Sequence, residues 1–202
     1  MLKLFSSKKP APKKLPIVVV SGLPRSGTSM MMKMLAEGGL QTVTDAIRSA
    51  DDDNPNGYFE FERVKQMTAG DRAWLDEAGG KVVKVISALL EHLPGGYTYK
   101  VIFMERALKE VLASQKKMLD HRGEQNKVTD AEMEEQYRAH LAAVKPWLAR
   151  QPHLEVLYVD YNKMMSEPGP LCKRLVEFLA LPLNEEKMLA VPNARLYRNR
   201  AS

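Results

Sequence analysis

The nine residues 21–29, Ser-Gly-Leu-Pro-Arg-Ser-Gly-Thr-Ser, follow directly after the apolar run 17–20. A buried strand that leads into a loop framed by glycines and then into a helix is the local structure that holds phosphate groups. Backbone N–H groups and the positive end of the helix dipole converge on an anion at such a loop. This order restricts the chain to α/β folds in which the carboxyl end of a strand meets a bound anion.

The loop has the frame of the P-loop, Gly-x-x-x-x-Gly-Lys-[Ser/Thr], but its positive charge is in a different place. Thr28 stands at the position of the P-loop lysine, and Arg25 lies inside the loop. Hydrolysis of a nucleoside triphosphate depends on that lysine reaching the β and γ phosphates, so this loop is predicted to hold another anionic group. A guanidinium gives planar, multidentate recognition of phosphate or sulfate oxygens. The alternative is that Ser26, Thr28 and Ser29 only cap the helix.

Alternating strands and helices are predicted along the rest of the chain. Three further short apolar runs have the pattern of buried strands, at 81–86, 99–104 and 154–159. Helical segments are predicted at 107–121, 129–150 and 170–180. Thr129 and Glu132 form a capping box at the start of the second of these, and Pro146 is expected to break or kink it. The order predicts a three-layer α/β/α fold with a central parallel sheet, like that of the P-loop NTPases.

Charge is unevenly distributed along the 202 residues. Residues 1–15 carry five lysines and no acid, and the remaining 25 Lys and Arg equal the 25 Asp and Glu. We therefore expect a basic, disordered tail at 1–15 and one domain at 16–202, whose balanced charge gives no support for nucleic acid as a partner. The tail is interpreted as a solvated arm, with contact to an anionic membrane surface as the alternative.

The chain is predicted to be cytoplasmic. It has no apolar run long enough for a transmembrane segment, and the basic tail lacks the apolar region of a secretory signal. The single cysteine, Cys172, excludes an internal disulfide and fits a reducing compartment. The sequence does not indicate an oligomeric state.

A second pair of polar residues follows the third predicted strand. Arg106 comes at the carboxyl end of that strand, and Ser114 lies two turns into the next helix. Open α/β sheets bind ligands at the carboxyl ends of their strands, so the pair is a candidate for a second anion site. Taken alone the signal is weak, because Arg and Ser are common on solvated helix faces.

Together, the loop and the Arg/Ser pair resemble the sulfotransferases that use 3′-phosphoadenosine 5′-phosphosulfate (PAPS). The similarity extends to Val159-Asp160-Tyr161, Pro168 and Phe178-Leu179, and so covers about residues 16–182. The resemblance implies that the 5′-phosphosulfate is held by Gly22, Pro24, Arg25, Ser26, Gly27, Thr28 and Ser29. It assigns the 3′-phosphate to Arg106 and Ser114.

The catalytic base is where the chain departs from many cytosolic members of that family. Those members have a histidine in a Lys-Thr-His stretch after the second strand, where this chain has Lys84-Val85-Ile86. Other branches use a glutamate after the first helix, and the resemblance then makes Glu60 the candidate base, with Glu62 and Asp45 as alternatives. The structural interpretation is that Glu60 and Glu62 are first-turn acids of a helix.

Two further roles are implied by the resemblance. Lys84 would lie near the bridging oxygen of the leaving phosphate, and Arg198, with Arg195 and Arg200, would close over the nucleotide. A solvated tail is the alternative for these arginines. Consecutive aspartates at 51–53 are interpreted as solvated charge, and no metal is predicted.

The predicted function is therefore transfer of a sulfuryl group from PAPS to an acceptor hydroxyl or amine, leaving 3′,5′-adenosine bisphosphate (PAP). Arg25, Lys84 and Glu60 are the predicted catalytic residues. The acceptor is a small molecule, a carbohydrate or a peptide. The alternatives are a small P-loop kinase and a degenerate, non-catalytic nucleotide-binding protein.

Overall fold

A computed structural model describes residues 15–45, 51, 54, 56–124 and 128–192. Their strands are β1 (Ile17–Gly22), β2 (Thr42–Val43), β3 (Val82–Lys84), β4 (Tyr99–Glu105) and β5 (Leu154–Asp160). The α-helices are α1 (Thr28–Glu37), α2 (Leu108–Arg122), α3 (Asp130–Leu148), α4 (Tyr161–Ser166), α5 (Pro168–Leu179) and α6 (Glu185–Leu189). The 3₁₀ helices are η1 (Glu62–Ala69), η2 (Ala73–Glu77) and η3 (Ser87–His92).

The described strands form one parallel sheet in the order β2-β3-β1-β4-β5. Strand β1 lies in the centre, and each of its residues is buried, which explains why its sequence is apolar without alternation. Successive side chains still point to opposite faces, so Val18 and Val20 pack into one core and Ile17 and Val19 into the other. Two separate cores therefore form, one on each side of the sheet.

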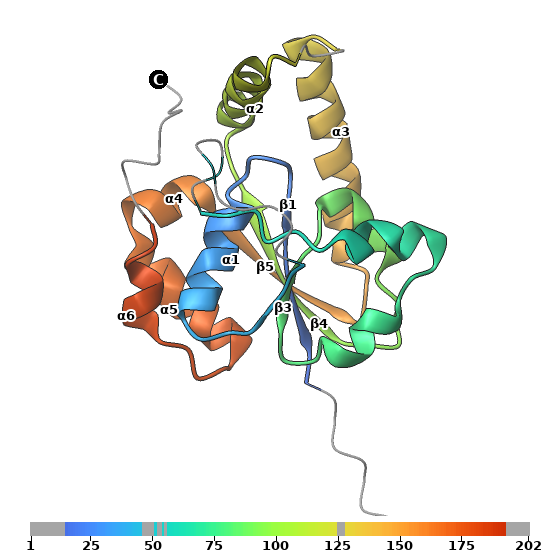
Figure 1. Cartoon of the computed structure of the whole chain (residues 1–202), viewed down its shortest axis with the longest axis vertical. Coiled ribbons are helices and arrows are strands. Elements are labelled where there is room, and N and C mark those ends of the chain that lie inside the picture. Colours follow the sequence, from blue (N-terminus) through green and yellow to red (C-terminus); the bar gives the residue numbers. More distant parts are fainter. Residues whose placement is uncertain (1–14, 46–50, 52–53, 55, 125–127, 193–202) are drawn as a thin grey trace, which may run out of the picture.

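The two faces are covered by different kinds of element (Figure 1). Helices α1, α4, α5 and α6 pack on the face that receives Val18 and Val20. The 3₁₀ helices and the end of α3 cover the other face, while α2 and the start of α3 extend beyond the carboxyl ends of the strands. This confirms the predicted three-layer α/β/α arrangement. In the described part of the chain, no helix has the length and apolar character needed to cross a membrane.

Most predicted elements are present, with some differences in their bounds. The capping box at Thr129 and Glu132 is formed, with both of its hydrogen bonds. Pro146 was expected to break or kink this helix, and the break is wrong, since α3 continues through Pro146 to Leu148. A proline removes only one backbone hydrogen bond, that of its own missing N–H to residue i−4. Strand β2 and the 3₁₀ helices η2 and η3 were not predicted, since they are short and weakly periodic. The helix named as the structural interpretation of Glu60 and Glu62 is present as η1, which begins at Glu62. Of the predicted tail at 1–15, residues 1–14 lie outside the described residues.

Candidate active site

Both glycines of the loop between β1 and α1 are required by close packing. Gly22 has φ +147°, and a Cβ there would lie 2.6 Å from Ser26 Oγ and 2.7 Å from the Met104 carbonyl oxygen. Gly27 has φ +98°, and its Cβ would lie 2.3 Å from Tyr161 Cδ2. Residues other than glycine rarely adopt such φ angles, and a Cβ atom does not fit at these distances. The glycine frame therefore lets the loop pass between β4 and the start of α4.

The loop is closed by its own polar groups. The Ser26 hydroxyl is buried and donates a hydrogen bond of 2.7 Å to the Leu23 carbonyl oxygen. Arg25 adopts a left-handed backbone conformation, with φ 65°. These features turn the chain sharply, so that Thr28 and Ser29 begin α1 at the edge of a cavity. The Ser26 side chain thus stabilises the loop. The contact between Ser26 and the 5′-phosphosulfate, which the resemblance implies, stays a prediction.

A cavity of about 290 Å³ lies over the start of α1. Its polar and charged lining includes Arg25, Thr28, Ser29, Asn54, Glu60, Lys65, Lys84, Gln115 and Arg122. Its apolar lining includes Leu23, Phe61, Val64, Val85, Ile86, Leu89 and Met118. The three residues predicted to be catalytic, Arg25, Lys84 and Glu60, therefore line one cavity although they come from separate parts of the chain. Pro24 and Gly22 also border it.

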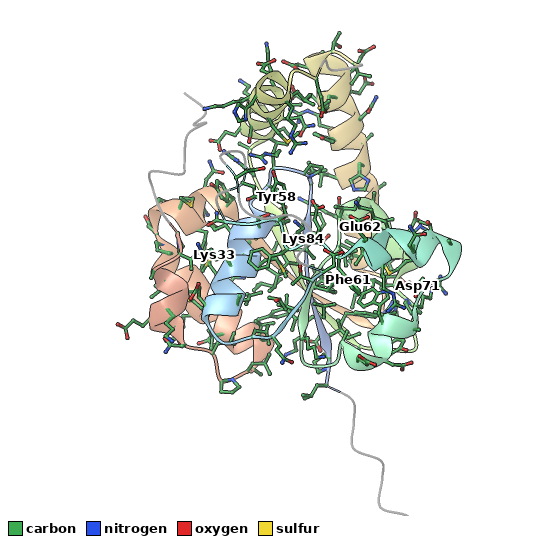
Figure 2. All side chains as sticks on the ribbon, viewed as in Figure 1. Lys33, Tyr58, Phe61, Glu62, Asp71 and Lys84 are labelled. Carbon is green, nitrogen blue, oxygen red and sulfur yellow. The ribbon has the colours of Figure 1, made fainter. Side chains whose placement is uncertain are left out.

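Lys84 is placed by strand β3 and by a contact with the segment before η1. It lies at the carboxyl end of β3, beside Val20 of β1, and its Nζ donates a hydrogen bond to the Tyr58 carbonyl oxygen. The Tyr58 hydroxyl donates to Asp51 Oδ2 at 2.7 Å and accepts from Arg122 Nη2 at 3.3 Å. Figure 2 shows Tyr58 and Lys84 close to each other near the middle of the molecule. Tyr58 thus connects β3 to helix α2.

The three candidate bases have different surroundings. Asp45 contacts the segment around Glu60: its N–H donates to the Glu60 carbonyl oxygen at 3.2 Å, and its Oδ2 accepts from the Glu62 N–H at 2.7 Å. Glu62 is exposed in the first turn of η1 and pairs with Lys65 at 2.7 Å. Of the three, only Glu60 is part of the cavity lining. Glu60 therefore stays the candidate base, whereas the structural interpretation fits Glu62.

Arg106 lies in a buried polar network behind the loop. Its Nε donates to Glu110 Oε2 at 2.9 Å, and the two side chains are 7% and 2% exposed. The other Glu110 oxygen accepts from Asn162 Nδ2 at 2.8 Å, and the guanidinium stacks 4.5 Å above the Tyr161 ring. Burial raises the pKa of the Tyr161 hydroxyl, an effect that the nearby Arg106 charge opposes. The network connects β4 and α2 to the start of α4.

The two predicted anion motifs touch each other through Arg25. Arg106 Nη1 donates to the Arg25 carbonyl oxygen at 3.1 Å, and Arg25 Nε donates to Ser114 Oγ at 3.0 Å. Ser114 is buried in α2, 89 residues away from Arg25 in sequence. Both members of the Arg/Ser pair therefore contact one residue of the glycine-framed loop.

Sequence reasoning missed several residues of the site. Glu110 was not named as a candidate, although its i,i+4 spacing from Arg106 is the signal for an ion pair. Asn162 carried no signal. Asn54 was not named as a candidate either, yet its Nδ2 donates to Ser29 Oγ at 2.9 Å. The predicted Arg198 lies outside the described residues, as do Arg195 and Arg200. Within the described residues, no cluster of three His, Cys, Asp or Glu side chains is arranged to hold a metal ion.

Comparisons with solved structures agree with the architecture. The sulfotransferase domain from the Synechococcus PCC 7002 olefin synthase is similar over 96% of this chain and 86% of its own, with a TM-score of 0.52 and 14% identity. A mouse sulfotransferase complexed with PAP is similar over 91% of this chain and 64% of its own, with a TM-score of 0.51 and 16% identity. At these identities the likeness shows a shared fold.

Comparisons of sequence identify the family. Cytosolic sulfotransferase 1 of Arabidopsis thaliana is 23% identical over 192 residues, which cover 84% of this chain. The chain spans little more than half of that relative, 58% of its length. The family model described as "Sulfotransferase domain" matches residues 15–199, from the start of β1 to beyond α6. Because that match covers nearly the whole sequence, the chain belongs to the sulfotransferase domain family.

Proposed function

We propose that this protein transfers a sulfuryl group from PAPS to an acceptor hydroxyl or amine. The observation that carries the proposal is the single cavity in which Arg25, Lys84 and Glu60 meet over the start of α1. Two cations and one carboxylate beside a helix N-terminus supply charge stabilisation, a base and an anion site in the same space. Membership of the sulfotransferase domain family supports this chemistry.

The donor would bind along the loop and the start of α1. Backbone N–H groups of the loop, the hydroxyls of Thr28 and Ser29 and the positive end of the α1 dipole suit the 5′-phosphosulfate. Arg106 and Ser114 would hold the 3′-phosphate, and Arg198 stays a prediction for the nucleotide. PAPS is a substrate in this scheme, and PAP is its product.

The reaction would be an in-line displacement at sulfur. A new bond forms between the acceptor oxygen or nitrogen and the sulfur as the bond from sulfur to the 5′-phosphate oxygen breaks. The acceptor proton passes to the Glu60 carboxylate. Negative charge that develops on the 5′-phosphate oxygen is stabilised by Arg25 and Lys84, and PAP leaves with that oxygen. The contact with Tyr58 holds the Lys84 ammonium in the cavity before the donor binds, which reduces the reorganisation needed in the transition state.

The acceptor would pack against the apolar lining of the cavity. Phe61, Ile86, Leu89 and Met118 belong to this lining, so an acceptor with an apolar body and one nucleophilic group is favoured over a fully polar one. Small-molecule alcohols and phenols meet this description, and carbohydrate and tyrosine-containing peptide acceptors complete the test panel. We expect the protein to act in the cytoplasm.

Calorimetry with PAP tests the donor assignment. We expect PAP to bind without added metal, and Mg²⁺-ATP to bind at least ten times more weakly because Thr28 replaces the P-loop lysine. Arg106→Ala should weaken PAP binding. Wild-type protein that binds Mg²⁺-ATP tightly and PAP not at all would reverse the assignment in favour of a kinase.

Transfer from ³⁵S-labelled PAPS to the acceptor panel tests the chemistry. Glu60→Gln should lower the transfer rate about 100-fold or more, because proton transfer by a positioned base contributes roughly 10²–10⁴-fold. PAP affinity should change little in this variant. Glu62→Gln is the matched control and should transfer at the wild-type rate. Equal rates for both variants would remove Glu60 from the mechanism.

A further inference from the structure

We infer that Arg25 binds both ends of the donor: its guanidinium is a third ligand of the 3′-phosphate, beside Arg106 and Ser114, as well as part of the 5′ cradle. This inference rests on the proposed function. It assigns to the loop arginine a role in recognising the 3′-phosphate, in addition to its place beside the reacting group.

Arg25 is held at both its main chain and its side chain by the residues proposed for the 3′-phosphate. Arg106 contacts the Arg25 carbonyl oxygen at 3.1 Å, and Ser114 Oγ accepts from the Arg25 Nε at 3.0 Å. The same arginine lines the cavity that contains Lys84 and Glu60. Its guanidinium therefore lies at the border between the two expected phosphate positions.

The Nε contact fixes how far a phosphate on Ser114 can be from Arg25. A phosphate oxygen that is hydrogen-bonded to the Ser114 hydroxyl lies about 2.7 Å from Oγ. Since Oγ is 3.0 Å from the Arg25 Nε, that oxygen lies within about 6 Å of the guanidinium in any direction. Opposite charges at this separation interact strongly at partly buried sites. The planar fork of an arginine can also bond to a phosphate while another of its N–H groups bonds elsewhere.

Arg106 alone is poorly placed to neutralise a phosphate dianion. Its side chain is 7% exposed, its Nε is bonded to the buried Glu110 carboxylate, and its Nη1 is bonded to the Arg25 carbonyl oxygen. The Glu110 charge offsets much of the Arg106 charge at this place. A second cation is therefore needed beside Ser114, and Arg25 provides it.

A shared arginine couples recognition of the donor to catalysis. A 3′-phosphate bound by Arg106 and Ser114 would fix the Arg25 guanidinium, and Arg25 also lines the cavity proposed for the sulfuryl group. A donor without the 3′-phosphate, such as adenosine 5′-phosphosulfate, would leave Arg25 less restrained. The structure thus points to a physical basis for preferring PAPS over adenosine 5′-phosphosulfate as the sulfuryl donor.

Titration calorimetry with 3′-AMP, 5′-AMP and PAP separates the two roles, with displacement titrations for weak binding. Arg25→Ala should weaken 3′-AMP and 5′-AMP binding each by roughly 10- to 100-fold, the loss of a hydrogen bond to a charged group. Lys84→Met should weaken 5′-AMP alone. Arg63→Ala, an exposed arginine paired with Asp71, controls for loss of one positive charge and should change neither affinity.

Arg25→Lys is the second variant: it keeps the positive charge but lacks the planar, forked set of N–H donors of the guanidinium. An ammonium can contact one phosphate at a time, so we expect near-wild-type 5′-AMP binding and at least a tenfold loss for 3′-AMP. Thermal melts identify any variant that is unfolded, and this conservative change decides the question if Arg25→Ala does not fold. Wild-type 3′-AMP affinity in a folded Arg25 variant would overturn the shared-ligand inference and leave the sulfotransferase proposal intact. Absence of PAP binding to the wild-type protein would overturn both.

Discussion

The two sides of the candidate site are built in different ways. On the loop side, defined as Gly27, Arg106, Glu110, Tyr161 and Asn162, side chains pack and bond to one another in the protein interior. On the acceptor side, defined as Asp45, Tyr58, Glu60 and Lys84, two main-chain oxygens are important acceptors. The Tyr58 carbonyl oxygen accepts from Lys84, and the Glu60 carbonyl oxygen accepts from the Asp45 N–H and the Thr44 hydroxyl.

This difference separates stability from chemistry. A buried side-chain network is destabilised when any member is removed, because the partner is left without compensation. A main-chain carbonyl oxygen, in contrast, is still present when the side chain of its residue is replaced. Changes on the loop side should therefore be measured first as loss of folding free energy, and changes on the acceptor side first as loss of transfer rate.

The largest expected effect is that of Glu110→Ala. This change leaves the 7%-exposed Arg106 guanidinium without its carboxylate, and removing one partner of a buried ion pair costs about 3–5 kcal/mol. Glu134→Ala is the matched control, because Glu134 and Arg138 form an i,i+4 pair of the same type whose side chains are 30% and 67% exposed. That pair should contribute about 0.5 kcal/mol or less. Urea unfolding of both variants measures the difference, and similar losses would show that Arg106 is not dependent on Glu110.

Gly27→Ala should have the next largest effect. Its Cβ would overlap Tyr161, and its backbone angle disfavours any side chain, so the two penalties together amount to about 3 kcal/mol. Gly39→Ala has the same φ of +98° with no atom within 4 Å of the added Cβ. This control should lose only about 1–2 kcal/mol from the backbone term. Equal destabilisation of the two variants would mean that Tyr161 can move aside and that the loop side is less tightly packed than the contacts indicate.

The loop side could be largely predicted because it depends on one local pattern. Strand, glycine-framed loop and helix are adjacent in sequence, so Gly22, Arg25 and Gly27 were identified from spacing alone. The close contact of Gly27 with Tyr161 joins residues 134 positions apart, and no local pattern contains it. Glu110 was not named from the sequence: its spacing from Arg106 is a local signal for an ion pair, but its second partner, Asn162, lies 52 residues away.

The acceptor side was harder to predict, since its segments have little regular structure. Lys84 and Glu60 were named from the resemblance, yet the Tyr58 carbonyl oxygen that holds Lys84 has no sequence signature, because every residue has such an oxygen. Asp45 was named as an alternative base, and its hydrogen bonds to the segment around Glu60 could not be read from the sequence. Strand β2, which precedes Asp45, has two residues and falls below what periodicity can detect.

Asp45→Ala examines the acceptor side and should have a moderate effect. The loss of the carboxylate that accepts from the Glu62 N–H removes a cap of η1, which costs about 1 kcal/mol. If the segment around Glu60 then shifts, transfer should fall by more than this stability change explains, with PAP affinity unchanged. Asp45→Asn keeps an oxygen acceptor and should restore most of the rate. Failure of Asn to restore the rate would point to the charge of Asp45, in place of its hydrogen bond, as the important property.

Tyr161→Phe is expected to change the free energy of unfolding least of these variants, through a dependence on pH that is seen only at high pH. Burial raises the pKa of the Tyr161 hydroxyl in the folded protein, so the unfolded chain loses this proton first as the pH rises. Stability from this group is therefore fully present below about pH 10, the ordinary tyrosine value, and is lost as the pH rises through the folded pKa. The variant should lose less unfolding free energy than the wild type between pH 9 and pH 11, when both are measured in urea at matched ionic strength. Tyr99, outside the site, also has a pKa raised by burial, and Tyr99→Phe should change the slope in the same direction. An unchanged slope for Tyr161→Phe alone would mean that the Arg106 guanidinium offsets the burial of the hydroxyl, and would make charge the dominant influence on the loop side.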